Sequence, residues 1–228
     1  MTAKRLVGAA QVAAAVRIFE ERLKETAAAE QALRRLARVM PGCDHESILL
    51  KVAALNQLYG TNVYAVVRMA SHIVRLFSTS PSWSFETVES VAALPPAGNQ
   101  KKVRHHRSFA SKFAHFFVDA DRFPLLDSYA AQRLGFHLGA RSLGAGFPQS
   151  YPAYARAFFR LLAASDLECR VVDLDKFLWL AGQHDVFVKG GRAVEVMGTE
   201  VVRLFRSKRP LDRDLVARLV FDSGRVDG

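Results

Sequence analysis

The chain has 228 residues, of which 50% are hydrophobic and 24% are charged. This composition is typical of a single globular unit and excludes disorder as the dominant state. The 32 Lys and Arg residues outnumber the 22 Asp and Glu residues and give a formal net charge of +10. An excess of this size favours a negatively charged partner, nucleic acid above all.

Neither the membrane nor an oxidising compartment is expected as the setting of this chain. Lys or Arg interrupts every apolar run before it reaches about 18 residues, and residues 1–11 lack the apolar middle of a signal peptide. Cys43 and Cys169 are too few for a disulfide framework, a four-thiolate zinc site or an iron-sulfur cluster. We therefore expect a cytoplasmic, nucleoid-associated monomer that uses no cofactor and no metal.

Apolar residues at helical spacing, bounded by helix-breaking residues, predict an all-α fold. The expected helices cover residues 8–40 (one long helix or two stacked ones), 47–59, 63–77, 85–92, 109–117, 128–138, 150–164, 174–181 and 211–220.

Several polar residues and glycines are expected at the ends of these helices. Asp127 or Ser128 is the predicted N-cap of one helix and Asp173 of another, and Gly182 is predicted to end the second. Gly60 is predicted to end the helix over 47–59. The alternating apolar residues of 186–196, which flank two glycines, predict a small β-hairpin.

We expect one globular unit, residues 1–228, with three parts along the chain. Residues 1–42 would form an N-terminal helical extension and residues 43–140 a core. Residues 141–228 would form a C-terminal helical part that packs with the N-terminal helices.

The helix predicted over 109–117 carries a compact group of polar residues. Ser108, Ser111, Lys112 and His115 fall on one side of a helical wheel, opposite a side rich in Phe. They form either an ordinary solvated face or part of a catalytic site, and the second interpretation requires a partner for Lys112.

Asp127, which follows Lys112 by one helix and a turn, is the candidate partner. A carboxylate at a helix N-terminus is kept ionised by the first-turn amides and the helix dipole, so it can stabilise positive charge on a substrate. The alternative role for Asp127 is that of a plain N-cap.

The segment from Ser108-Phe-Ala-Ser-Lys112 to Phe123-Pro-Leu-Leu-Asp127 resembles the helix-hairpin-helix/Gly-Pro-Asp superfamily of DNA glycosylases. The order lysine, helix, proline, aspartate carries the resemblance. It implies two helical lobes with a cleft between them, with Lys112 as the nucleophilic amine of bifunctional members and Asp127 as the catalytic carboxylate.

The resemblance also implies a residue that fills the gap left by the extruded base. Leu55-Asn56-Gln57-Leu58 matches the segment that supplies this residue, so Asn56, Gln57 and Tyr59 are candidates; the alternative for Asn56 and Gln57 is to cap a helix end. The glycine-rich hairpin that precedes the lysine in the family is absent, and Arg104-His-His-Arg107 stands in its place. Lys101 or Lys102 is the weaker candidate amine.

The basic run is the expected DNA-binding surface, unless it is merely a solvated loop. This surface consists of Lys101, Lys102, Arg104, His105, His106 and Arg107, with Ser108 and Ser111 beside it. His115 and Trp179 are candidates for the wall of a base pocket, although Trp179 is more simply explained by core packing.

The expected function is that of a DNA glycosylase that flips a damaged or modified base out of double-stranded DNA and cuts its N-glycosidic bond, with or without lyase activity. One alternative is a noncatalytic helical DNA-binding module on the same scaffold. Another is a glycosylase that removes hypermodified bases from phage DNA in antiviral defence, which would make the enzyme a defence factor instead of a repair factor.

Overall fold

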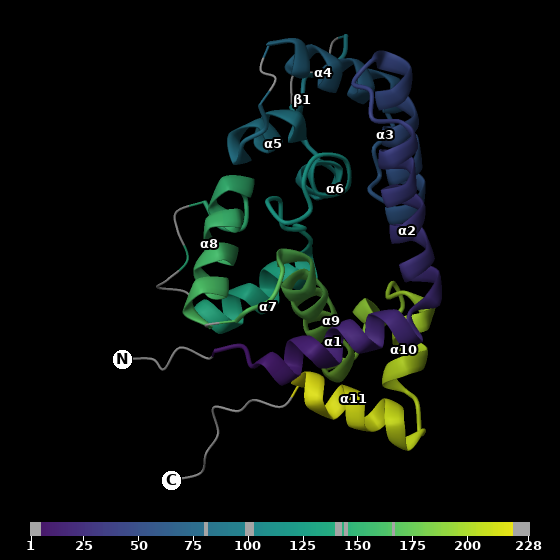
Figure 1. Cartoon of the computed structure of the whole chain (residues 1–228), viewed down its shortest axis with the longest axis vertical. Helices are drawn as coiled ribbons and strands as arrows, with labels where there is room; N and C mark the ends of the chain where they lie inside the picture. Colours follow the sequence, from purple (N-terminus) through teal and green to yellow (C-terminus); the bar gives the residue numbers. More distant parts are fainter. Residues whose placement is uncertain are drawn as a thin grey trace. The chain divides into compact units, whose positions relative to one another are not determined.

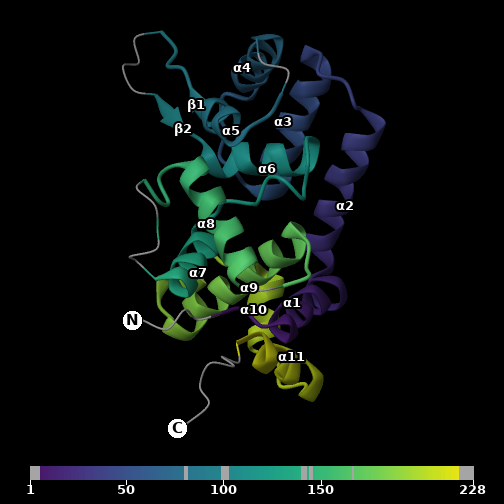
Figure 2. The same cartoon turned by 60° about the vertical axis from the view of Figure 1, so that its left-hand side comes forward.

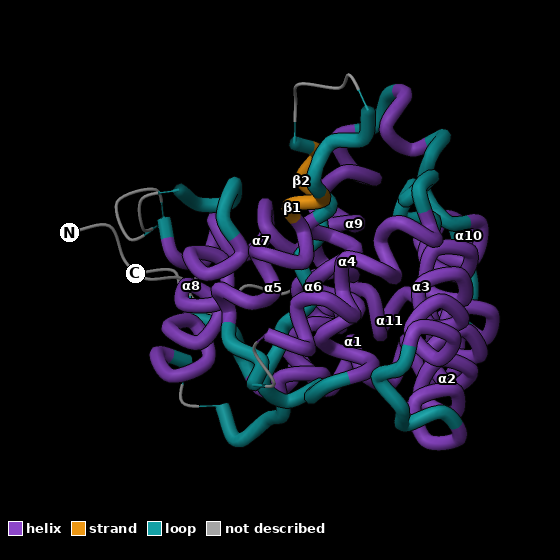
Figure 3. The backbone as a smooth tube through the Cα atoms, turned by 90° about the horizontal axis from the view of Figure 1, so that it is seen from above, coloured by secondary structure: helices purple, strands orange, loops and turns teal. Residues whose placement is uncertain are grey.

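A computed structural model of the chain describes residues 6–79, 82–98, 103–139, 143, 146–165 and 167–220. Within these residues the fold is all-α, as predicted, and a pair of two-residue strands is the sole β-structure (Figures 1 and 3). The helices are α1 (Ala9–Arg22), α2 (Lys24–Val39), α3 (His45–Tyr59), α4 (Val66–Thr79), α5 (Phe85–Ala92), α6 (Arg107–Phe117), α7 (Ser128–Leu138), α8 (Tyr151–Ala164), α9 (Val171–Lys189), α10 (Thr199–Phe205) and α11 (Pro210–Val220).

The helices divide between two compact units. Unit 1 combines residues 1–28, 127–145 and 156–228, and unit 2 combines residues 29–126 and 146–155. The borders at residues 42 and 140 that we expected from the sequence differ from this division. The reason is that the C-terminal helices bury the apolar face of α1, so the beginning and the end of the chain share a core.

Unit 1 is built around α9, which packs against α1, α7 and α11. Ile18, Leu174 and Phe177 are fully buried in this unit. The Arg22 guanidinium at the end of α1 donates from Nε to Oδ1 of Asp212 on α11 at 2.6 Å. The first and last helices are thereby joined by a partly buried ion pair in addition to their apolar contact.

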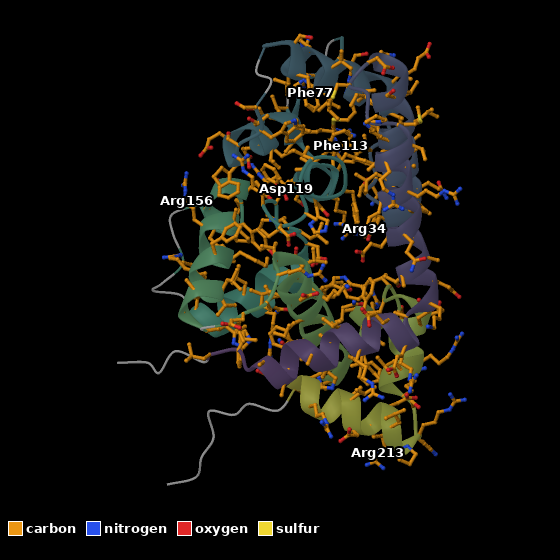
Figure 4. The ribbon with its side chains drawn as sticks, viewed as in Figure 1. Arg34, Phe77, Phe113, Asp119, Arg156 and Arg213 are labelled. Atoms are coloured by element: carbon orange, nitrogen blue, oxygen red, sulfur yellow. The ribbon has the colours of Figure 1, made fainter. Side chains whose placement is uncertain are left out.

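Unit 2 holds an aromatic core between α4, α5 and α6. The indole of Trp83 stacks on the ring of Phe113 with centroids 5.9 Å apart and also contacts Phe77 and Phe123. Phe77 and Phe113 are labelled in Figure 4. Strands β1 (Ala93–Leu94) and β2 (Arg104–His105) pair antiparallel between α5 and α6 (Figure 2).

Local chemistry explains several helix ends. The Asp44 carboxylate accepts a hydrogen bond from the Ser47 backbone at the start of α3, and Gly60 ends this helix in the left-handed region with φ of 54°. Ser84 forms a capping box with Thr87 at the start of α5. The prediction that Gly60 ends its helix is thus confirmed.

The predicted hairpin at 186–196 is wrong. Helix α9 continues to Lys189, and Arg192–Val194 forms a short 3-10 turn. Gly190 and Gly191 have φ of 71° and 81°, which suits the end of a helix as well as a hairpin turn. The same two glycines therefore stop α9 instead of reversing a strand.

The predicted ends of α9 are also wrong. Arg170 is its N-cap and Asp173 lies in its first turn, where it pairs with the Arg170 guanidinium. Gly182 lies inside the helix because α7 approaches closely there: a Cβ at this position would lie 2.3 Å from the Tyr129 carbonyl oxygen. Helix α10 has no counterpart among the predicted elements.

Within the described residues, no helix is both long enough and apolar enough to cross a membrane.

Replacing Gly182 by Ala should destabilise unit 1 by on the order of 3 kcal/mol, because the added methyl group meets backbone that cannot rotate away. Urea-induced unfolding followed by circular dichroism measures this loss. Gly198→Ala is the matched control, since nothing lies within 4 Å of its Cβ position and its φ is −58°. Equal unfolding midpoints for the two variants would contradict the close packing of α7 on α9.

Candidate active site

Helix α6 is buried on both of its sides. Its Phe side packs in the core of unit 2, but Ser111, Lys112 and His115 on the other side are only 0%, 6% and 2% exposed. Ser108 is half-buried, so the four polar residues do not form a solvated face, and the simpler of the two interpretations is removed. Burial of polar side chains in such number requires partners inside the protein.

Lys112 is held by two neighbours within unit 2. Its Nζ donates to Ser108 Oγ at 2.6 Å and lies 5.8 Å from the centre of the Tyr59 ring. The Tyr59 ring packs in turn on Phe116, with centroids 5.3 Å apart. Both the hydroxyl and the aromatic face stabilise an ammonium group away from bulk water, and together they fix the position of the amine.

A second buried lysine in unit 2 was not singled out in the sequence. Lys51 donates from Nζ to the Gly42 carbonyl oxygen at 2.8 Å, and its Nζ lies 5.7 Å from the centre of the Phe117 ring. Burial lowers the pKa of Lys51 below its ordinary value. A lysine within a predicted apolar helix was the signal that could have identified it.

In the loop from Phe123 to Leu126, each of the four residues has a backbone group that is hydrogen-bonded to a side chain of α6 or α8. The His115 ring donates from Nδ1 to the Phe123 carbonyl at 3.0 Å, and the Leu126 amide donates to Ser111 Oγ at 3.0 Å. From the first turn of α8, the Tyr151 hydroxyl donates to the Pro124 carbonyl at 3.0 Å and the Tyr154 hydroxyl to the Leu125 carbonyl at 2.7 Å.

The two tyrosines of α8 are the residues that sequence reasoning missed. Their rings do pack in the core, as the helical pattern predicts, but their hydroxyls bond to the loop. The pattern of apolar residues records the burial of a ring and carries no signal for the direction of its hydroxyl.

Asp127 follows this loop directly and is the N-cap of α7, as predicted. Its Oδ1 accepts from the Ala130 backbone amide at 2.8 Å, and its side chain is half-buried. The backbone of the preceding residue is fixed in unit 2 by Ser111, whereas Asp127 itself belongs to unit 1 with α7. Its carboxylate is thus oriented by the first turn of the helix that it begins.

The basic run divides into residues with different roles. Arg104 and His105 are exposed on β2. The Arg107 guanidinium pairs with Oε1 of Glu89 at 2.7 Å, while Oε2 of Glu89 accepts from the Tyr151 amide at 2.7 Å. The charge of Arg107 is therefore balanced by a carboxylate inside unit 2.

The basic run also contains His106 and two lysines. Burial lowers the pKa of His106, so this ring is less readily charged than a free histidine. Lys101 and Lys102 lie outside the described residues. Of the predicted basic contacts that the structure describes, Arg104 is the fixed cation that remains exposed.

The structure separates Asn56 from the other two candidates for filling a base gap. Asn56 Oδ1 accepts from Thr61 Oγ1 at 2.9 Å and from the Val63 amide at 2.8 Å, so its side chain shapes the turn after α3. Gln57 is exposed on the same helix. Gln57 and Tyr59 remain the candidates for insertion into DNA.

The last candidate for the wall of a base pocket, Trp179, lies outside unit 2. Trp179 lies in unit 1, where its ring meets the edge of Phe19 at 6.4 Å, in agreement with a packing role. Within the described parts of the chain, no group of three or more His, Cys, Asp or Glu side chains is placed to hold a metal ion.

Comparisons with known proteins give a partial match. Residues 11–121 match the family model described as HI_0787_N, N-terminal domain. An uncharacterized protein of Haemophilus influenzae (strain Rd) is 25% identical over 144 residues, which cover 63% of this chain and 70% of that protein. No solved structure matches the chain. The family match includes Lys112 and its neighbours and ends before Asp127.

Replacing Asn56 by Ala should lower the free energy of unfolding by about 1–3 kcal/mol, because the Val63 amide loses its acceptor. Gln57→Ala, one residue along the same helix, should change it by less than about 0.5 kcal/mol since its side chain is exposed. Thermal unfolding of both variants measures the difference. A stable Asn56→Ala protein would show that the turn does not depend on this amide.

Proposed function

We propose that the chain is a DNA glycosylase that extracts a damaged or modified base from double-stranded DNA and cuts its N-glycosidic bond, with Asp127 as the essential carboxylate. The observation that carries the proposal is that the backbone leading to this residue is held in place by hydrogen bonds. Four consecutive loop residues are held by side chains, and the carboxylate itself accepts a helix N-terminal amide. A preorganised negative charge is what this chemistry requires.

Cutting the bond between the sugar C1′ and the base builds positive charge on the sugar. A carboxylate that is already ionised and oriented stabilises this charge without reorganising during the reaction. The Ala130 amide in the first turn of α7 donates to Oδ1 of Asp127, so the carboxylate is oriented at the N-terminus of this helix. Asp127 therefore suits the role of a fixed electrostatic stabiliser.

Lys112 suits the role of the amine in a bifunctional reaction. A neutral amine forms a bond from its nitrogen to C1′ while the C1′–base bond breaks and its electron pair leaves with the base. Opening of the sugar ring then gives a Schiff base, from which β-elimination nicks the strand. In a monofunctional reaction Asp127 would instead activate water, and Lys112 would stay charged.

The charge of the chain supports DNA as the substrate. The net charge of +10 and the exposed Arg104 on β2 suit a phosphate backbone. The substrate base is either a lesion, in a repair enzyme of the nucleoid, or a hypermodified base of phage DNA, in a defence enzyme. A noncatalytic DNA-binding module on the same scaffold would keep the charge without the chemistry.

Asp127→Asn should reduce base release by at least about 100-fold while DNA binding is unchanged. Asn caps helices as well as Asp does, so α7 should stay folded and the loss would report the missing charge. Mass spectrometry of free bases released from damaged DNA and from modified phage genomes measures the reaction.

Ser128→Ala, at the exposed neighbouring position, is the matched control and should release bases normally. Equal release by the Asn variant would exclude Asp127 as the catalytic carboxylate. If the wild type binds DNA but releases no base from any of these DNAs, the noncatalytic module is the correct function.

Borohydride should trap a covalent protein–DNA adduct if Lys112 is the nucleophile, and Lys112→Gln should abolish the trapped band. Lys51→Gln is the matched control, because Lys51 is also buried beside an aromatic ring in unit 2. Denaturing gel electrophoresis detects the adduct, and thermal unfolding confirms that both variants fold. A band lost with Lys51→Gln alone would assign the amine to Lys51, and a band kept in both variants would exclude both lysines.

A further inference from the structure

A dense group of exposed cations lies in unit 1, in the last turn of α10 and the beginning of α11. We name it the α10–α11 basic surface, and it consists of Arg203, Arg206, Lys208, Arg209 and Arg213. Figure 4 labels Arg213 on α11. Among the described residues, none of these five side chains has an ion-pair partner. These five exposed cations lie within eleven residues of sequence, and Arg209 among them also attracts the nearby Asp212 carboxylate.

Two carboxylates near this surface make their hydrogen bonds to other parts of unit 1. Glu200 accepts from the Glu25 amide at 2.8 Å and the Thr26 amide at 3.1 Å, which places it at the start of α2. Asp212 accepts from Ser207 Oγ and from the Arg22 guanidinium, each at 2.6 Å. The Ser207 hydrogen bond, with Arg22 nearby, keeps the pKa of Asp212 below its ordinary value.

A groove of about 740 Å³ adjoins two of these cations. Arg203 of α10 and Arg206, the C-cap of this helix, line it together with the apolar side chains of Phe187, Val194 and Met197. Glu195 lines it as well. Arg203 and Arg206 are three residues apart, so both project from the same side of α10.

We propose that the α10–α11 basic surface and this groove form a DNA-contacting surface of unit 1, with Arg203 and Arg206 binding phosphates of the DNA backbone. The proposal rests on the proposed function in that DNA is its ligand. It is independent of the chemistry at Asp127 and Lys112.

The composition of the surface favours DNA over an acidic membrane. Four of its five cations are arginines, whose planar guanidinium groups bind phosphate oxygens in pairs. A helix that inserts into a membrane interface needs an apolar outer face. The exposed positions of α11 carry a single large apolar side chain, Leu211, beside the charged Arg213, Asp214 and Arg218. Leu215 and Leu219 of the same helix are buried in unit 1.

The test compares two double variants of the full chain. Arg203→Gln/Arg206→Gln removes two cations of the surface, and Arg35→Gln/Arg38→Gln removes two exposed arginines with the same spacing on α2 of unit 2. Fluorescence anisotropy of a labelled duplex, measured over a range of salt concentrations, gives the affinity and its salt dependence. Thermal unfolding confirms that both variants fold like the wild type.

The α10 variant should bind DNA on the order of tenfold more weakly, and the slope of log affinity against log salt should be shallower by about 1.8, or 0.9 for each lost phosphate contact. The α2 variant should keep the wild-type affinity and slope. Unchanged binding by the α10 variant, equal losses in both variants, or binding by the wild type to anionic vesicles but not to DNA would overturn the proposal.

Base release, measured separately at saturating enzyme, distinguishes this proposal from the proposed function. If the wild type releases no base and only the α10 variant loses DNA affinity, the proposed glycosylase function is wrong and the proposed DNA-contacting surface is supported. If the wild type releases bases and both variants bind DNA as the wild type does, the proposed DNA-contacting surface is wrong and the proposed glycosylase function is supported.

Discussion

The site depends on the fastening of one short stretch of backbone, residues 123–126. Within a protein core an unpaired carbonyl or amide is costly, so each of these groups needs a partner. The partners are side chains of α6 and of the first turn of α8, two elements separated by more than thirty residues of sequence. This arrangement defines where the chain leaves unit 2 before Asp127 begins the cap of α7. Precise positioning of a charged side chain starts with a rigid backbone beside it.

The same network explains the unusual polarity of α6. Its Ser111 and His115 are buried because they satisfy the loop, and its Lys112 is buried beside a hydroxyl and an aromatic ring. Glu89 extends the network, because one carboxylate pairs with Arg107 at the start of α6 and with the first amide of α8. A charged residue in the predicted DNA-binding run thus serves the architecture of unit 2. Charge in a sequence becomes a binding surface only where the fold leaves it unpaired.

Each unit contains both paired and exposed cations. In unit 2, Arg107 of the basic run has a carboxylate partner, and Arg34 of α2 pairs with Glu30 at 2.6 Å while lying over the Phe116 ring at 5.6 Å. In unit 1, Asp212 and Glu200 bond to α1 and α2, and Asp214 pairs with Arg218 of its own helix, while the arginines of the α10–α11 basic surface are exposed. Among the described residues, the fold therefore decides which cations are exposed, and a count of residues does not locate them.

The sequence by itself determined the helical class, most helix positions and the caps at Asp127 and Gly60, because these follow from local periodicity and from hydrogen bonds within one turn. It also brought Ser108, Ser111, Lys112 and His115 onto one side of a helix, which requires nothing beyond the helical repeat. Only the tertiary structure decided that this side is buried, that the hydroxyls of Tyr151 and Tyr154 fasten the loop, and that Gly182 lies within α9 where α7 approaches. These outcomes depend on contacts between residues distant in the chain, and local pattern carries no record of which distant backbone a side chain will meet.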